Sequence, residues 1–100
     1  MISLAVKSES IQVNQIKTTE TDLTLEFVDG RTLSVPLTWY PRLLHGTAVE
    51  RQTFELLDEG RMIHWLLLDE DLTVAGILAG ARSGESQESL QKWLNSRTVQ

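Results

Sequence analysis

The chain has 100 residues, of which 41% are hydrophobic and 23% charged, and these values are typical of one globular domain rather than a disordered segment. It contains no cysteine, which excludes disulfides, thiolate zinc sites and cysteine nucleophiles. The formal net charge of −5 disfavours direct nucleic-acid binding, which depends on clustered Lys and Arg, and suits a basic protein partner.

No apolar run approaches the roughly 20 residues needed to cross a bilayer. The opening residues are too few and too mixed in character for a signal peptide. We therefore expect a cytoplasmic protein with no membrane association.

Alternation of apolar and polar residues marks the first part of the chain as β-structure. Ile2, Leu4 and Val6 share one parity, and Ile11 and Val13 share another after a polar break. Because a period of two indicates a half-buried strand, we expect strands over 2–7 and 11–17.

The segment 23–35 predicts a β-hairpin around Asp29-Gly30. A two-residue turn would pair Leu25 with Ser34, mixing polar and apolar residues on each face. A three-residue loop over 28–30 pairs Leu25 with Leu33 and gives Gly30 the left-handed position of a bulged turn. The pattern therefore favours the three-residue loop.

Short helices and a second hairpin follow. Thr38 can cap a helix that begins at Trp39, with Pro41 in its first turn. Thr47 and Glu50 have the spacing of a capping box for a helix near 48–53. We expect strands over 54–57 and 61–65 around a turn at 58–60, although 52–57 could equally extend the helix.

The acidic triplet 69–71 has two interpretations. It could bind a metal or a basic partner with help from His64, or it could begin a helix, where carboxylates interact favourably with the helix dipole. We favour the helix start, with Thr73 as the cap of a helix over 74–79 that ends at Gly80.

The sequence predicts an α+β fold: an antiparallel β-sheet made of hairpins, short helices packed on it, and a C-terminal helix. We assign one domain to 1–80, a small polar linker to 81–85 and an amphipathic helix to 86–97. Leu90, Trp93 and Leu94 form the narrow apolar stripe of that helix. The stripe either docks on its own domain or forms a homodimer.

No catalytic signature is present. His45 and His64 are too few for a catalytic zinc site, which usually has three protein ligands, and no Gly-x-Ser-x-Gly elbow or phosphate-binding loop occurs. We therefore expect no enzyme, no catalytic residues, no cofactor and no metal site.

The aromatic and charged residues of the central stretch are the candidates for a binding surface. Large aromatics can be interface anchors, but in a small domain they are more often core residues. The candidate interface residues are Trp39, Tyr40, Arg42, His64, Trp65, Asp69, Glu70, Asp71 and Trp93.

The central stretch also resembles a known family. The motifs that carry the resemblance are Asp29-Gly30-Arg31, Val35-Pro36-Leu37, Trp39-Tyr40-Pro41-Arg42-Leu43, Glu50-Arg51, Ile63-His64-Trp65, Leu68-Asp69-Glu70-Asp71-Leu72 and Leu78-Ala79-Gly80. Over about residues 10–80 they resemble the prokaryotic DUF2442 family, with Leu66 where that family would have proline. The resemblance implies a small α+β fold and no established activity.

Members of that family are similar to genes found beside small toxin-like partners, and some carry an added helical DNA-binding segment. Three hypotheses follow. The first is a non-catalytic interaction or regulatory module, antitoxin-like, that binds a basic protein encoded by a neighbouring gene. The second is an accessory or DNA-binding transcriptional regulator, and the third is a metal-dependent enzyme that uses His64 and the acidic triplet.

Overall fold

The computed structural model describes residues 11–98, and the expected strand over 2–7 lies outside them. The elements in chain order are β1 (Val13–Thr18), β2 (Asp22–Phe27), β3 (Thr32–Pro36), the 3₁₀-helix η2 (Leu37–Trp39), α1 (Pro41–Leu44), α2 (Ala48–Gln52), β4 (Phe54–Leu57), β5 (Met62–Trp65), β6 (Glu70–Thr73), α3 (Val74–Leu78) and α4 (Gln87–Thr98). The α+β class is confirmed.

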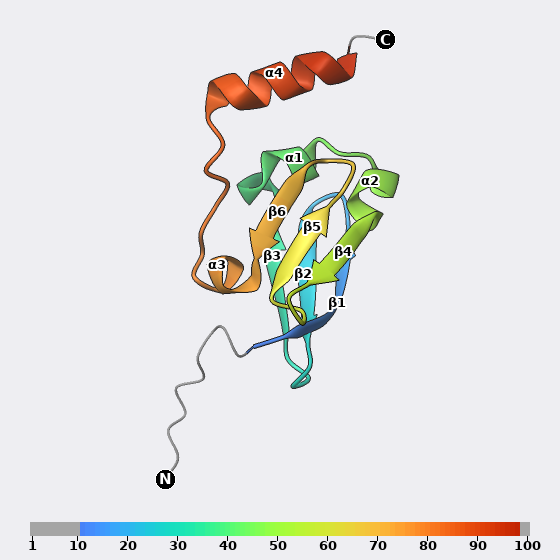
Figure 1. The fold of residues 1–100 in the computed structure, drawn as a ribbon, viewed down its shortest axis with the longest axis vertical. Coiled ribbons are helices and arrows are strands. Elements are labelled where there is room, and N and C mark those ends of the chain that lie inside the picture. The colour runs from blue at the N-terminus through green and yellow to red at the C-terminus, as the bar shows by residue number, and fades with distance from the viewer. Residues whose placement is uncertain (1–10, 99–100) are drawn as a thin grey trace.

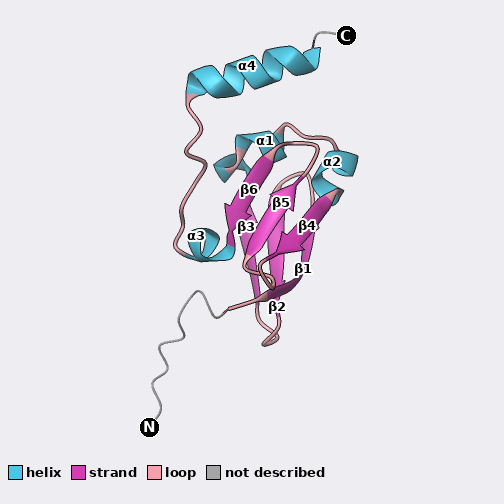
Figure 2. Ribbon diagram, viewed as in Figure 1, coloured by secondary structure: helices cyan, strands magenta, loops and turns pink. Residues whose placement is uncertain are grey.

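The strands form two antiparallel three-stranded sheets, ordered β1-β2-β3 and β4-β5-β6. Figure 1 shows the second sheet in front of the first, with α1 and α2 at one end and α3 beside β6. Figure 2 separates the two strand layers from the helices by colour. Both layers contribute to one core, in which Leu23, Leu25 and Ile63 are fully buried.

The first hairpin has the predicted register. Leu25 pairs with Leu33 and Leu23 pairs with Val35, so one face of the hairpin is apolar. The loop is 28–30, closed by the bond from the Phe27 N–H to the Arg31 carbonyl, and Gly30 has a φ of +96°. The apolar face and the three-residue loop require the same pairing of the two strands, so together they fix this register.

The capping box at α2 is also confirmed. The Glu50 N–H donates to Thr47 Oγ1 at 3.1 Å, and the Thr47 N–H donates to Glu50 Oε1 at 2.8 Å. The chain then leaves the helix after Gln52, so 54–57 is strand β4 rather than a helical extension.

Two local predictions were wrong. The helix expected from Trp39 is instead the 3₁₀ turn η2 followed by α1, in which Pro41 is the first helical residue and Tyr40 precedes it. Proline lacks the N–H that a helix interior needs, so the chain restarts at that residue.

The acidic triplet was the other error, because it does not begin a helix. Asp69 lies in a turn with a φ of +51°, and Glu70–Thr73 forms β6 against β5. The helix begins only at Val74, with Thr73 Oγ1 accepting from the Gly76 N–H as its cap. Pairing with β5 therefore overrides the preference of carboxylates for a helix start.

Figure 1 shows helix α4 lying above α1 and α2, and side chains connect it to them: Arg97 contacts Glu50 of α2, and Trp93 contacts Arg42 of α1. Arg97 forms two bonds to the Glu50 carboxylate, at 2.6 and 2.9 Å. The guanidinium groups of Arg97 and Arg42 lie 4.6 and 5.0 Å from the ring centroid of Trp93. The bonds to Arg97 lower the pKa of Glu50 from 4.5 to about 2.

We expect the substitution Arg97→Ala to release α4, because it removes both bonds to Glu50 and one cation–π contact with Trp93. Hydrogen exchange of the α4 amides should accelerate at least about tenfold, which corresponds to about 1.4 kcal/mol. The control Lys92→Ala, which removes an exposed side chain, should leave exchange unchanged.

Since the pKa of Glu50 is lowered, wild-type α4 should stay docked above pH 4.5 and be released as the pH falls towards 2.

Gly60 lies in the β4–β5 turn, where it connects the second sheet to β1 of the first sheet, and this contact leads to a second prediction. Its carbonyl accepts from the Val13 N–H at 2.9 Å, and a Cβ there would lie 2.4 Å from the Val13 carbonyl oxygen. Gly30 also has a positive φ but has open space around it. In urea unfolding we expect Gly30→Ala to cost about 1–2 kcal/mol from backbone strain alone, and Gly60→Ala to cost clearly more. Equal losses would contradict the close approach of β1 to the β4–β5 turn.

Candidate functional site

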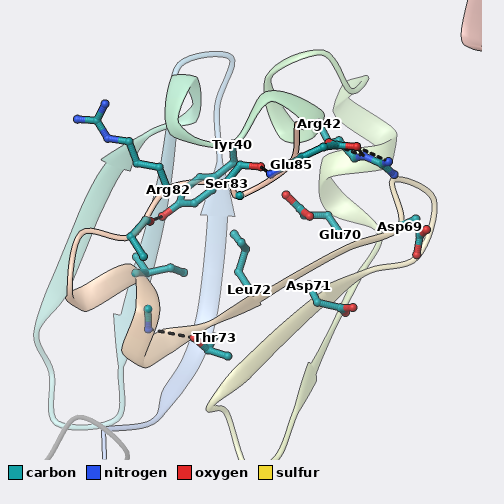
Figure 3. A pocket seen from close by; sticks show the side chains of 14 residues that line it. Tyr40, Arg42, Asp69, Glu70, Asp71, Leu72, Thr73, Arg82, Ser83 and Glu85 are labelled. Atoms are coloured by element: carbon teal, nitrogen blue, oxygen red, sulfur yellow. Dashed lines mark hydrogen bonds and ion pairs between the residues drawn. The ribbon is translucent and has the colours of Figure 1, made fainter. Parts of the chain in front are cut away.

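An open groove of about 470 Å³ runs along the outer edge of β6. Its volume lies within the range common for ligand sites in proteins. Figure 3 shows β6 on one side of it and the segment 81–85 on the other. The lining residues are Tyr40, Arg42, Asp69, Glu70, Asp71, Leu72, Thr73, Gly76, Ile77, Ala81, Arg82, Ser83, Gly84 and Glu85.

Strand β6 presents its side chains alternately to the groove and to the outer surface. Figure 3 shows the side chains of Glu70 and Leu72 pointing towards the groove, while those of Asp69 and Asp71 point away from it. Asp71 instead contacts His64 on the neighbouring strand through its carboxylate. The three acids of the triplet therefore do not converge on one point.

Glu70 is the carboxylate at the centre of the groove. Burial raises its pKa, the positive charge of Arg42 opposes that rise, and the negative charge of Glu85 adds to it. Among residues 11–98, no Lys, Arg or His forms an ion pair with Glu70. A half-buried carboxylate without an ion-pair partner is unfavourable for folding and is the kind of group a cationic ligand would satisfy.

Arg42 closes one end of the groove. Its Nε and Nη2 donate to the Glu85 carboxylate, the shortest bond being 2.7 Å, and its Nη1 donates to the Leu68 carbonyl at 3.1 Å. The bonds from Arg42 to the carboxylate lower the pKa of Glu85, which also accepts from the Ser89 hydroxyl at 2.6 Å. The Arg42 guanidinium also stacks on the Trp93 ring, so its contacts are made within the protein.

The far rim of the groove is fixed by aromatic residues of η2 and the residue after it. The Tyr40 hydroxyl donates to the Ala81 carbonyl at 3.1 Å, and the Ser83 N–H donates to the Trp39 carbonyl at 3.0 Å. The Arg82 guanidinium lies 4.9 Å from the centroid of the Trp39 ring. Segment 81–85 is therefore bound to the domain along its length and forms a wall of the groove.

The structure gathers only some of the candidate interface residues. Tyr40, Arg42, Asp69, Glu70 and Asp71 line the groove, and Trp39 supports its rim. Trp93 lies on α4 against Arg42, and His64 lies beside Asp71.

Trp65 is fully buried, and its Nε1–H donates to the Arg51 carbonyl at 3.0 Å. It therefore belongs to the core of the described chain. Among the charged residues of the groove, Arg82 and Glu85 were not anticipated. They lie in a stretch that reads as a small polar linker, and the bond from Arg42 to Glu85 spans 43 residues without any sequence signal.

Within residues 11–98, no three His, Asp or Glu side chains come together in a way that could hold a metal ion. Over the same residues, no helix combines the length and the apolar character required to cross a bilayer.

The fold and groove define a class: a small two-sheet α+β domain with a polar groove at a sheet edge. The family model described as "Protein of unknown function (DUF2442)" matches residues 13–83, and the chain belongs to that family. The resemblance stated from the sequence is thereby confirmed.

The fold recurs in a solved structure. The crystal structure of a protein of unknown function from Rhodospirillum rubrum is similar over 77% of this chain and 95% of that chain, with a TM-score of 0.65 and 20% identity. At that identity the likeness concerns the fold alone. No curated protein matches the chain.

Glu70→Gln tests the energetic position of this carboxylate. The substitution removes a half-buried charge while keeping the side-chain shape, so we expect the melting temperature at pH 7.5 to rise by about 2–4 °C, as roughly 0.5 kcal/mol gives in a domain of this size. Because the pKa of Glu70 is raised, the wild-type carboxyl becomes neutral as the pH falls, and the difference should shrink by pH 4. The exposed control Glu20→Gln should leave the melting temperature unchanged at both pH 7.5 and pH 4. A lower melting temperature for Glu70→Gln than for the wild type would show that the positive charge of Arg42 fully offsets the cost of burying the Glu70 carboxylate.

Proposed function

We propose that this protein is a non-catalytic interaction module that binds a basic protein partner in the groove beside β6. The observation that carries the proposal is the half-buried Glu70 carboxylate, which has no ion-pair partner among residues 11–98. A Lys or Arg side chain of a partner would supply the missing charge. Pairing a desolvated carboxylate in this way is strongly favourable compared with leaving it alone.

The charges around the groove favour the same type of partner. Four carboxylates and two guanidinium groups line it. Both guanidinium groups are engaged, since Arg42 is bonded to Glu85 and Arg82 stacks on Trp39. Stacking on Trp39 leaves the charge of Arg82 in place, but the four carboxylates outnumber the two guanidinium groups. The groove therefore has a net negative charge, which steers basic partners towards it.

The particular role we propose is that of the acidic, antitoxin-like half of a two-protein pair. Its partner would be a small basic protein encoded by a neighbouring gene. A DNA-binding role has less support, because Arg97 on α4 is bonded to Glu50 and the exposed Lys92 lies beside Glu88. That leaves no basic stripe on α4 for phosphate contacts.

Co-expression with the product of the adjacent gene, followed by affinity purification and sizing, tests this function. We expect a stoichiometric complex whose Kd rises at least about tenfold, or about 1.4 kcal/mol, with Glu70→Gln. Glu20→Gln has the same change in charge away from the groove and should bind as the wild type does. A lone chain on sizing, or equal affinity in the two variants, would contradict the proposal.

A further inference from the structure

The groove contains an unpaired edge of a β-sheet. Strand β6 is at the end of the order β4-β5-β6, so only one of its sides is paired. We propose that an extended, basic segment of a protein partner docks along this edge as an added strand, with a Lys or Arg side chain at Glu70. This inference deepens the proposed function and rests on it.

The register shows which backbone groups of β6 face the groove. The Val74 N–H donates to the Arg61 carbonyl at 2.9 Å, just beyond the pair Met62–Thr73. Bonded and non-bonded pairs alternate along an antiparallel ladder. Counting back from Val74, Leu72 and Glu70 are bonded to β5, and the backbone groups of Asp71 and Thr73 face the open edge.

Two of these outward groups remain for a ligand. The Asp71 backbone N–H interacts with the Glu70 carboxylate, and the Thr73 carbonyl belongs to the N-cap of α3. The Asp71 carbonyl and the Thr73 N–H, on either side of Leu72, have no backbone partner within residues 11–98. An acceptor and a donor in this arrangement are what an adjacent strand uses in β-augmentation.

The groove has the length that such a strand needs. It follows all four residues of β6, a length of roughly 13 Å at about 3.3 Å per residue. Segment 81–85 forms the opposite wall of the groove and is held in place by the bonds of Tyr40 and Ser83 (Figure 3). The edge carries no proline or lysine, the residues that commonly block strand addition.

The negative charge of the groove favours a basic segment over a second copy of this chain as its ligand. A second copy of this chain would bring another net charge of −5 to an acidic groove, which is unfavourable. A basic segment instead places its cation beside Glu70 and its backbone beside Asp71 and Thr73. Alternate side chains of an added strand face the groove, so a segment with Lys or Arg at every second position fits best.

The test uses the full chain and the peptide acetyl-Thr-Lys-Val-Lys-Thr-amide, titrated by NMR at low ionic strength. Two further peptides have the same sequence and charge but carry methyl groups on backbone nitrogens. One is methylated at both Lys residues, and the other is methylated at Val and both Thr residues. The backbone groups of alternate residues point to opposite sides of a strand. Strand addition therefore predicts that one N-methylated peptide binds as the parent does and the other at least about tenfold more weakly.

Two readouts on the protein complete the test. Exchange of the Thr73 amide should slow on binding, whereas that of Leu72, already bonded to β5, should change little. Glu70→Gln should weaken binding at least about tenfold, and Glu20→Gln should leave it unchanged. These results together would support strand addition at β6.

The outcomes separate this inference from the proposed function. Equal binding of both N-methylated peptides with an unchanged Thr73 amide would overturn strand addition and leave a side-chain interaction at Glu70 standing. Loss of peptide binding, with a Glu70-dependent complex still formed by the co-expressed protein, would do the same. Slow Thr73 exchange in the free protein that speeds up on dilution would assign the edge to a second copy and overturn the proposal. Failure of both the peptide and the co-expressed protein to bind would overturn the function as well.

Discussion

The buried guanidinium of Arg51 is the interaction on which the arrangement of the helices depends. Arg51 is 7% exposed and is the buried charged residue of the described chain. It has no carboxylate partner there; its Nη1 donates to the Gly46 carbonyl at 2.6 Å and the Leu43 carbonyl at 3.3 Å. A buried charge is tolerated only when its donors are satisfied, and the carbonyl groups that follow a helix are suitable acceptors. The end of α1 must therefore lie over Arg51.

This constraint extends to the groove through two connections. The Arg51 carbonyl accepts from Trp65 Nε1–H, so α2 is fixed to β5 and, through it, to β6. The carbonyl contacts at Leu43 and Gly46 fix α1, which carries Arg42, whose side chain is 15% exposed and paired with Glu85. Arg42 and β6 are the end and the wall of the groove. One buried cation thus sets the distance between them, although it does not itself line the groove.

Prediction from the sequence succeeded where local chemistry decides the structure. The three-residue loop before Arg31 follows from the parity of Leu25 and Leu33, and the α2 cap follows from the spacing of Thr47 and Glu50. It failed at β6, whose four residues include two carboxylates and become a strand only by pairing with β5. The bond between Arg42 and Glu85 was equally hidden, because a contact over 43 residues depends on tertiary structure. The sequence therefore predicted only part of the site: Arg42 and Glu70 were among the candidate residues, but segment 81–85, which forms the opposite wall of the groove, was not.

The position of the groove relative to the family boundary has a further consequence. The family match ends at residue 83, so Glu85 and α4 lie beyond it. Yet Arg42 is bonded to Glu85 and stacked on Trp93 of α4, and Arg97 of α4 is bonded to Glu50 in the α2 cap. Glu85 in this added segment therefore neutralises Arg42, a cation at the end of the acidic groove. By pairing with Arg42, Glu85 leaves Glu70 without an ion-pair partner among residues 11–98, and Glu70 is the residue on which the proposed binding of a basic segment depends.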